Sequence, residues 1–454
     1  MFCRVAGNLY LCLIKKRTMM KRYLFSILTL WAIGLIEVSA QKWRYDFIVP
    51  DDGNFMDAIH AANGRFDKDA RYRIFIRAGH HISEGEGDTI RTKENGVEVR
   101  FPSPIATLTA GNTSIVGEDR LTTMVENRPH HEGISITSTL FLNGADNTYL
   151  QDLELYCNLQ NNTNPKAGRA VALNERNCGR NVFRNVYLNS TQDTYWTNDG
   201  GTTYLDSCTI AGTVDFICGG GTIYFDKCGI RLVERSNWEK KDIITAPATA
   251  DTLQYGYVFN ECEVYGSDNQ KIKFMLGRPW KFAPRCVWLN CLFRAMPQAE
   301  GWDNMHGMLP KLFAEYKSRY VGSDGSQKAI DLSKRKTVFQ SQEKEDMPVD
   351  YKPELTSQEA SAYALDKVFP NWNPRTVCRQ VAPPEKVRLK GRKLLWDDVA
   401  EAGCYAVYVD GKLTDFTTES QYVVPKDVRK GVKLYVRCAN EMGGLGDGSS
   451  EVTL

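Results

Sequence analysis

A six-residue pattern recurs along the middle of the chain and constrains its fold more than any other feature. In each copy, positions 1 and 6 are apolar, position 3 is polar and position 4 is a small or branched apolar residue, while positions 2 and 5 vary. We interpret each copy as a short β-strand with alternating side chains. The copies are Leu150–Leu155, Phe183–Leu188, Leu205–Ile210, Phe225–Ile230, Phe259–Val264 and Trp288–Phe293. Their spacing, roughly 20 to 34 residues, is typical of a solenoid whose every coil carries strands and turns. The pattern predicts an all-β fold, a right-handed parallel β-helix.

Four of the thirteen cysteines of the chain belong to the same pattern. The fourth position holds Leu153, Val186, Cys208, Cys228, Cys262 and Cys291. Equivalent positions of successive coils stack inside a β-helix, so we expect the four thiols to form a ladder of small buried groups. The chain has thirteen cysteines, and an odd number does not suit complete disulfide pairing. A disulfide framework or a zinc site is the weaker alternative, because no cysteine pair has ligand spacing.

Two segments beside the repeats are expected to be helical. Residues 54–63 place apolar side chains at helical spacing and would cap the N-terminal coil of the solenoid. The segment Leu355–Val368 is expected to form one helix, with Thr356 as N-cap and Glu359 completing a capping box. This helix would pack against the outside or the end of the solenoid.

The character of the sequence changes near Pro383. Short alternating strands follow, with a hairpin signal at Asp410-Gly411. They predict a small β-sandwich that resembles a fibronectin type III module, with Trp396 as its buried tryptophan. The expected organisation is a leader with an upstream extension over residues 1–40, the β-helix over 41–380 and the β-sandwich over 381–454.

The N-terminus has the features of an export signal. Lys21-Arg22 precedes the apolar run Tyr23–Ile36, and small residues follow at Val38–Ala40. A membrane anchor is the rival interpretation, but the run is short and Glu37 closes it. We therefore expect export to the periplasm or the extracellular space, without stable membrane insertion.

Charge argues against one large class of partner. The whole chain has 57 Lys and Arg against 55 Asp and Glu, and residues 41–454 have 51 against 54. Without a basic field over the protein, nucleic acid is not an expected partner. We expect a monomer.

Two aspartates are spaced so that a β-helix would bring them together. Gln192-Asp193 precedes Asp215 by about one coil, and equivalent positions of adjacent coils lie roughly 4.8 Å apart. Arg278 and Trp280 follow downstream. Either aspartate alone is more typical of a turn, but two carboxyls with an amide, a guanidinium and an aromatic ring favour an acyl-transfer site.

At these residues the chain resembles pectin methylesterases, the pectinesterase family of carbohydrate esterases. The motifs run in family order between about residue 45 and residue 375. They are Ala170–Leu173, Gln192–Thr194, Gly212–Ile217, Leu276–Trp280, Gly301-Trp302 and Phe313–Tyr316. The resemblance implies the same parallel β-helix and the hydrolysis of galacturonate methyl esters in pectin or polygalacturonate, without cofactor or metal.

The resemblance also implies a role for each site residue. Asp215 would be the nucleophile and Arg278 its ion-pair partner, while Asp193 would be the general acid and then the general base. Gln192 would donate a hydrogen bond to the oxyanion of the tetrahedral intermediate. Three aromatic residues could stack on sugar faces: Trp280, Phe216 and Trp196. The alternative is a place in the core for Trp280 and Phe216, and in the core or the groove wall for Trp196.

The chain departs from the family pattern in two places. Arg169 stands before Ala170–Leu173, where the family usually has Gln, a second oxyanion donor. Arg169 is expected beside Gln192, binding the oxyanion or a free galacturonate carboxylate; the alternative is that it points to solvent. Cys218–Gly221 replaces Phe-Gly-Asn/Ser-Ala, and we expect this to alter only turn shape and groove width.

Two other functions remain open on the sequence. One is a β-helix polysaccharide lyase, which usually needs Ca²⁺ and a Lys or Arg base, or a glycoside hydrolase with suitably spaced carboxylates. The other is a pectin-binding relative without activity, which Arg169 makes conceivable. The order of the motifs favours the esterase.

Overall fold

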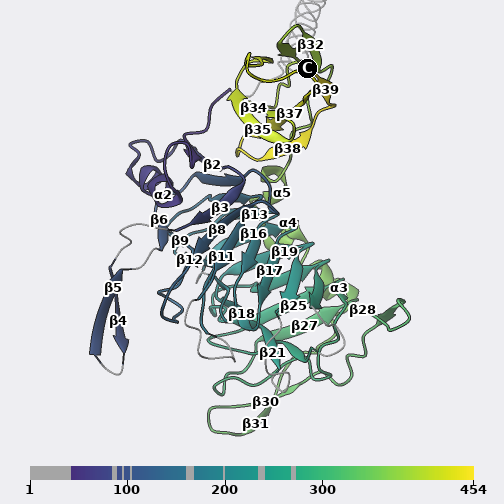
Figure 1. Cartoon of the computed structure of the whole chain (residues 1–454). Coiled ribbons are helices and arrows are strands. Elements are labelled where there is room, and N and C mark those ends of the chain that lie inside the picture. The colour runs from purple at the N-terminus through teal and green to yellow at the C-terminus, as the bar shows by residue number, and fades with distance from the viewer. Residues whose placement is uncertain are drawn as a thin grey trace, which may run out of the picture.

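The computed structural model describes residues 42–83, 89–94, 97–102, 105–159, 168–197, 200–233, 241–266 and 272–454. Successive coils of the chain stack along one axis and form three parallel sheets (Figure 1). The fold is a right-handed parallel β-helix, as the repeats predict. The expected export signal lies outside the described residues.

Each of the central coils contributes one strand to each of three long sheets. Sheet 1 runs β1 (Phe47–Val49), β2 (Tyr72–Ile76), β7 (Thr113–Gly117), β10 (Tyr149–Gln151), β13 (Asn181–Arg184), β16 (Thr202–Asp206), β19 (Thr222–Asp226), β22 (Tyr257–Asn260), β25 (Arg285–Leu289) and β27 (Leu312–Tyr316). Sheet 2 runs β3 (Gly79–Ile82), β8 (Thr123–Asn127), β11 (Glu154–Cys157), β14 (Tyr187–Asn189), β17 (Thr209–Gly212), β20 (Gly229–Leu232), β23 (Glu263–Gly266), β26 (Leu292–Phe293), β28 (Arg319–Val321) and the antiparallel β29 (Gln327–Ala329). Sheet 3 runs β6 (Ala106–Leu108), β9 (Leu140–Asn143), β12 (Leu173–Arg176), β15 (Tyr195–Thr197), β18 (Val214–Gly219), β21 (Asp242–Pro247) and β24 (Phe274–Gly277).

The recurring six-residue pattern is not one strand, as expected, but a corner between two strands. Its polar third residue has a positive φ in each copy, for example 50° at Asn185 and 54° at Ser207. This left-handed residue follows the strand of sheet 1 and turns the chain into sheet 2. The residue two positions before it and the residue directly after it, such as Leu205 and Cys208, both lie in the core. The polar side chains at this position are those that tolerate the left-handed conformation best or face solvent.

The predicted ladder of cysteines is present inside the solenoid. Cys208, Cys228, Cys262 and Cys291 are buried and form no disulfide. The thiols lie within hydrogen-bond range of sheet 1 carbonyls one coil earlier, for example Cys208 Sγ and the Phe183 oxygen at 3.3 Å. Beside the ladder, Phe225, Phe259 and Trp288 stack with ring centroids 4.3 and 3.9 Å apart.

The ends and one outer face of the solenoid are covered by short elements. The predicted N-terminal cap is α2 (Phe55–Gly64), whose Asn54 and Asp57 form a capping box and whose apolar side faces the core. Two antiparallel hairpins project from the coils: β4 (Thr89–Glu94) with β5 (Val97–Pro102), and β30 (Val338–Gln340) with β31 (Asp346–Pro348). Across the described ranges, no helix has the length and apolar character needed to span a bilayer.

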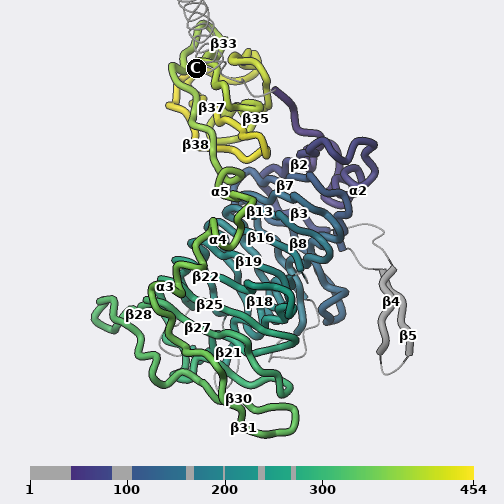
Figure 2. Tube along the Cα trace, turned by 180° about the vertical axis from the view of Figure 1, so that it is seen from behind, coloured from purple at the N-terminus to yellow at the C-terminus, as the bar shows by residue number. Residues whose placement is uncertain are grey.

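The single helix expected over Leu355–Val368 is instead two short helices. They are α3 (Ser357–Ser361), which has the predicted Thr356–Glu359 capping box, and α4 (Leu365–Val368). The break occurs because the Tyr255 hydroxyl donates to the Ala362 carbonyl, at 3.1 Å, while Ala364 is extended. With α5 (Pro374–Val377), these helices follow the outer face of sheet 1 (Figure 2).

The last seventy residues form two antiparallel sheets around their own core. One sheet holds β32 (Arg388–Lys390), β33 (Lys393–Leu395) and β36 (Gln421–Val423); the other holds β34 (Cys404–Val409), β35 (Lys412–Thr417), β37 (Lys433–Ala439), β38 (Leu445–Gly448) and β39 (Val452–Thr453). Trp396 is 3% exposed in that core and packs edge-on against Tyr405. The resemblance to a fibronectin type III module remains a prediction.

The sandwich is docked on the N-terminal coils of the β-helix (Figures 1 and 2). Phe416 packs against Tyr45 and Phe75, with ring centroids 4.7 and 4.9 Å apart. The Tyr45 hydroxyl donates to the Gly443 carbonyl at 2.5 Å, and an Arg437 guanidinium nitrogen donates to the Glu118 carbonyl at 3.2 Å. The sandwich therefore packs on sheet 1, away from the face formed by sheet 3.

Candidate active site

The two aspartates lie on adjacent coils beside sheet 3. Strand β15 pairs with β18 in a register that matches Tyr195 with Ile217, so Asp193 is the equivalent of Asp215 one coil earlier. Both residues are nearly buried, at 6% and 4% exposed. The juxtaposition predicted from the spacing of one coil is confirmed.

Backbone geometry at both aspartates is unusual. Asp193 has φ 61° and Asp215 has φ 50°, in the left-handed region that most residues avoid. The register of β18 with β21 also shifts between Val214 and Ile217, which places Asp215 at a β-bulge. Bulges and left-handed residues redirect side chains out of the regular alternation, and they are common beside active sites.

Arg278 comes from the residue after β24 and holds the Asp215 carboxylate with two parallel bonds. Its Nε lies 2.8 Å from Oδ1 and its Nη2 lies 2.5 Å from Oδ2. Burial raises the pKa of Asp215, and the hydrogen bonds and charge of Arg278 oppose that rise. This fork geometry fixes the orientation of the carboxylate and favours its ionised form.

Asp193 is in a different state from its neighbour. Burial and the charge of Asp215 raise the pKa of Asp193 to about 7, while Arg169 and hydrogen bonds with Cys218 and Gln192 act in the opposite direction. One carboxyl is thus paired with a guanidinium, and the other holds a proton near neutral pH. A carboxylate held by a guanidinium beside a carboxyl that can carry a proton is the arrangement that a nucleophile and a general acid require.

Arg169 lies beside Gln192, as the sequence predicts. The two residues form a parallel bridge in which the Ala170 N–H donates to the Gln192 carbonyl at 2.9 Å. The Arg169 side chain is 48% exposed, and its Nη2 lies 3.2 Å from Glu132 Oε1. Glu132 also accepts the Arg169 backbone N–H at 3.1 Å, a partner that sequence analysis did not identify.

The aromatic residues divide into two groups. Trp196 and Trp280 are partly exposed, with the Arg176 and Lys281 cations over their rings at 5.7 and 4.5 Å. Phe216 is fully buried in the core of the solenoid, so the expectation that it stacks on a sugar is wrong. The bulge at Asp215 turns the carboxylate toward the site and sends the next side chain inward.

The substitution at Cys218 has a larger consequence than the expected change in turn shape. Cys218 is 2% exposed, and its thiol lies close enough to the Asp193 carboxyl to lower the pKa of that carboxyl. Burial raises the pKa of this thiol well above its ordinary value, so it remains protonated and can donate. The only signal in the sequence was that Cys218 follows Asp215 by three residues, where the family has Phe.

Within the described ranges, no group of three or more His, Cys, Asp or Glu side chains has a geometry that could hold a metal ion. The charge at the site comes from Arg278 and Arg169 against Asp193 and Asp215. The described residues thus offer acid, base, nucleophile and hydrogen-bond donors. This set is sufficient for acyl transfer.

Comparison with known sequences assigns most of the solenoid to one family. The family model "Pectinesterase" matches residues 106–350, more than half of the chain. A pectinesterase of Petunia integrifolia is 28% identical over 225 residues, which cover 47% of this chain and 58% of the relative. A putative pectinesterase 11 of Arabidopsis thaliana is 31% identical over 172 residues, which cover 37% of this chain and 46% of the relative. The chain spans about half the length of these curated relatives.

Solved structures match over a longer part of the chain. A pectin methylesterase from carrot aligns with a TM-score of 0.55 and 19% identity, covering 74% of this chain and 98% of the other. PemA, a pectin methylesterase from Erwinia chrysanthemi, aligns with a TM-score of 0.54 and 22% identity, covering 73% and 99%. At this level of identity the likeness establishes the fold.

Proposed function

The chain belongs to the pectinesterase family, and we propose that it hydrolyses the methyl esters of galacturonate residues in pectin and releases methanol. The observation that carries the proposal is the pair of buried aspartates on adjacent coils, of which Asp215 is held by Arg278 and Asp193 has a pKa of about 7. The substrate class follows from the names of its relatives.

In the proposed first step the Asp215 carboxylate attacks the C6 carbonyl carbon of a methylated galacturonate. Arg278 keeps the carboxylate ionised and aimed. The C–O bond to the methoxy group then breaks, and the departing oxygen takes the proton of Asp193 to leave as methanol. An acyl-enzyme anhydride on Asp215 and a negatively charged Asp193 remain.

In the second step Asp193 acts as a base. It removes a proton from water as the water oxygen attacks the acyl carbon, and the anhydride bond to Asp215 breaks. The Asp215 carboxylate and the protonated Asp193 are restored, and the galacturonic acid released loses its own proton to the solvent. Gln192 and Arg169 lie side by side at the edge of the site and would donate to the oxyanion of both tetrahedral intermediates. Trp196 and Trp280 would pack on the sugar rings.

Methanol release from pectins of differing methylation and branching tests this proposal. Wild-type protein should release methanol and leave polymer length unchanged. Unsaturated products of β-elimination would instead indicate a lyase, and new reducing ends a glycoside hydrolase. Binding of pectin without any product would indicate the non-catalytic relative.

The proposed activity also bears on where the protein works and on its oligomeric state. Pectin is a plant cell-wall polymer too large to enter a cell, so we propose an exported protein that works outside the cytoplasm. The acid pair, Gln192 and Arg278 all come from one chain, so a monomer contains a complete set of catalytic groups.

Exhaustive chelation with EDTA is expected to leave the rate of methanol release unchanged. Each proposed step uses side chains only, and the guanidinium of Arg278 supplies the positive charge at the nucleophile. Initial rates before and after dialysis against the chelator measure this. Loss of activity that Ca²⁺ restores would contradict the proposed chemistry and favour the lyase.

Replacing Arg169 by Ala is expected to lower turnover about tenfold, equivalent to about 1.4 kcal/mol of transition-state stabilisation. Arg169→Gln should retain much of the activity, because an amide also donates to an oxyanion. The positive charge of Arg169 lowers the pKa of Asp193, so its loss raises that pKa. The protonated acid then persists to higher pH, and the alkaline limb of the pH–rate profile should move upward.

The exposed Arg180, whose backbone N–H bonds Thr202 Oγ1 at 2.9 Å, offers the matched control. Arg180→Gln removes the same charge from the protein without touching the site. A wild-type rate and pH profile for Arg169→Ala would show that the oxyanion is held by Gln192 without help from Arg169.

A further inference from the structure

A second concave site lies where the sandwich meets the β-helix. It has a volume of about 950 Å³, within the roughly 300–1,000 Å³ typical of ligand pockets. Its walls come from the start of β2, the linker after α5 and the turn between β37 and β38, with Trp43 at one side. Neither module forms this cleft alone.

Three arginines line the cleft, and Arg71 is the most informative of them. Its guanidinium donates to Ser114 Oγ and to the Asn147 carbonyl, both at 3.1 Å. Among the described residues, no carboxylate lies within 4.0 Å of it. Burial and the nearby charge of Arg73 lower the pKa of Arg71 to about 10, although the charge of Glu441 acts in the opposite direction. The cation is thus held in an unfavourable environment without a directly bound carboxylate.

The other two arginines add positive charge at the same place. Arg73 lies over the Trp43 ring at 4.2 Å, and its Nε donates to the Glu441 carbonyl at 2.9 Å. Arg379 is 73% exposed and makes one loose ion pair, at 3.4 Å, with exposed Glu401. Among the described residues that line the cleft, two are acidic, Glu401 and Glu441, and three are arginines. The lining therefore has one more positive than negative charge.

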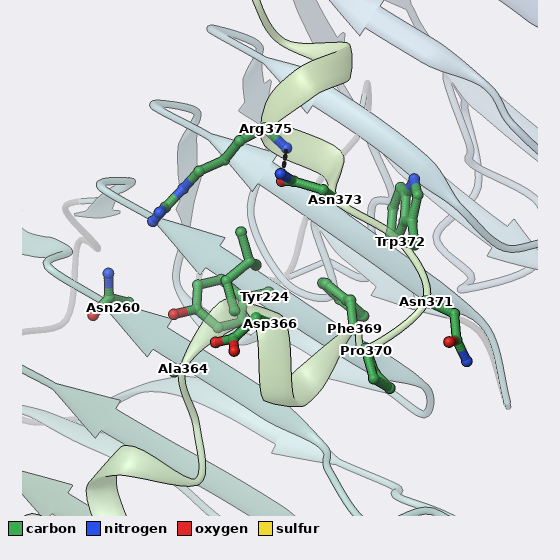
Figure 3. Close-up of a pocket in the computed structure, with 11 residues that line it drawn as sticks. Tyr224, Asn260, Ala364, Asp366, Phe369, Pro370, Asn371, Trp372, Asn373 and Arg375 are labelled. Carbon is green, nitrogen blue, oxygen red and sulfur yellow. Dashed lines mark hydrogen bonds between the residues drawn. The ribbon is translucent and has the colours of Figure 1, made fainter. Parts of the chain in front are cut away.

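The pocket on the outer face of sheet 1 shows the opposite arrangement (Figure 3). Its cation, Arg375, is already bound to the buried Asp226: Nε and Nη2 both donate to Oδ2, at 3.1 and 2.7 Å. Asp366 also lines that pocket. This pocket therefore has no arginine left to bind an anionic ligand, whereas the cleft lined by Arg71, Arg73 and Arg379 has.

We propose that the cleft between the β-helix and the sandwich binds the carboxylates of a de-esterified galacturonan segment. The inference rests on the proposed function, which makes such segments the product of the enzyme. Each galacturonate gains a carboxylate when its methyl group is removed, and guanidinium groups bind carboxylates through paired hydrogen bonds. A methyl ester is neutral and lacks that interaction, so the cleft distinguishes product from substrate. Holding a finished segment there raises the local concentration of polymer at the catalytic face.

Hydrogen–deuterium exchange of the full chain with trigalacturonate locates this binding separately from the acid pair. Exchange should slow in peptides covering residues 69–73 and 439–443 with the free acid. It should not slow there with the trimethyl ester, which is tested on the Asp215→Asn protein because that variant does not convert the ester into the acid during the measurement. Arg379→Glu should weaken the protection of these peptides, raising the apparent Kd about tenfold or more. Arg379→Gln, which only removes the charge, should give a smaller change in the same direction.

Arg388→Glu is the matched control, because Arg388 is also an exposed arginine of the C-terminal part paired with an exposed carboxylate, Asp397. It should bind like wild type. Absence of protection at the cleft in a protein that releases methanol would overturn this inference alone. Equal protection by acid and ester, or by Arg379→Glu and wild type, would also overturn it. Protection at the cleft in a protein that releases no methanol would instead count against the proposed function.

Discussion

Replacing Asp215 by Asn is expected to lower the rate of methanol release by at least about 1,000-fold. The amide is neutral and is a poor nucleophile, and losses of this size are usual when a nucleophile is removed. The side chain remains isosteric, so the coil should keep its packing. Initial rates on methylated pectin, together with the midpoint of thermal unfolding, measure both effects.

The single variant Asp193→Asn tests the other carboxyl, because it lacks the proposed proton donor. We expect the rate of methanol release to fall about 100-fold or more, with the formation of the acyl-enzyme most affected. Asp206→Asn is the control: Asp206 is also bonded to an arginine of the adjacent coil, Arg184, at 2.5 Å, but it lies on sheet 1. A folded Asp215→Asn protein with a near wild-type rate would remove Asp215 as the nucleophile.

The solenoid could be predicted from the sequence because its signal is repetitive. Each coil needs a small buried residue at the corner between sheets 1 and 2, and Cys208 and its three equivalents show this directly. What the alternation of apolar residues could not reveal is that a left-handed residue, such as Ser207, divides each copy into two strands. The core residues on the two sides of such a corner, such as Leu205 and Cys208, are three positions apart rather than two, and an apolar pattern alone does not show whether a turn or a continued strand separates them.

The site was predictable to the extent that it depends on coil spacing. Asp193 and Asp215 are brought together by backbone register alone, which the one-coil separation encodes. Phe216 was misassigned because the bulge reverses the direction of side chains within three residues. Cys218 and Glu132 were missed because their contacts depend on side-chain directions that neither spacing nor residue type determines.

Glu315, which lies behind the site rather than in it, also has a side-chain partner that the sequence could not identify. It lies in the Phe313–Tyr316 motif and points into the solenoid below Trp288, its neighbour in sheet 1. A buried carboxylate there requires a partner, but the sequence does not say which one. The structure identifies Arg335, whose Nε lies 2.6 Å from Glu315 Oε1, and both side chains are at most 1% exposed.

This ion pair is linked to the catalytic arginine through one loop. Arg335 also donates to the carbonyls of Gln298 and Ala299, at 3.2 and 3.0 Å. A few residues later the Gly301 carbonyl accepts the Leu276 N–H at 2.7 Å, and Trp302 pairs with Gly277. The loop thereby fixes the end of β24, from which Arg278 reaches Asp215.

Replacing Glu315 by Ala is therefore expected to lower the free energy of unfolding by about 3–5 kcal/mol, because the substitution leaves the Arg335 cation buried without its partner. Urea unfolding followed by tryptophan fluorescence measures the change. The exposed pair Lys328–Asp324, at 3.1 Å, is the control, and Asp324→Ala should lower the free energy of unfolding far less than Glu315→Ala does.

The double variant Glu315→Leu with Arg335→Met separates charge from packing. Both charges are then absent, and the apolar side chains fill a similar volume, so most of the lost stability should return. The carbonyls of Gln298 and Ala299 would still lack their donor. We therefore expect the double variant to recover stability but not the full rate of methanol release, since the loop that positions Arg278 is less constrained. A double variant as unstable as Glu315→Ala would show that the cost lies in packing rather than in the unpaired charge.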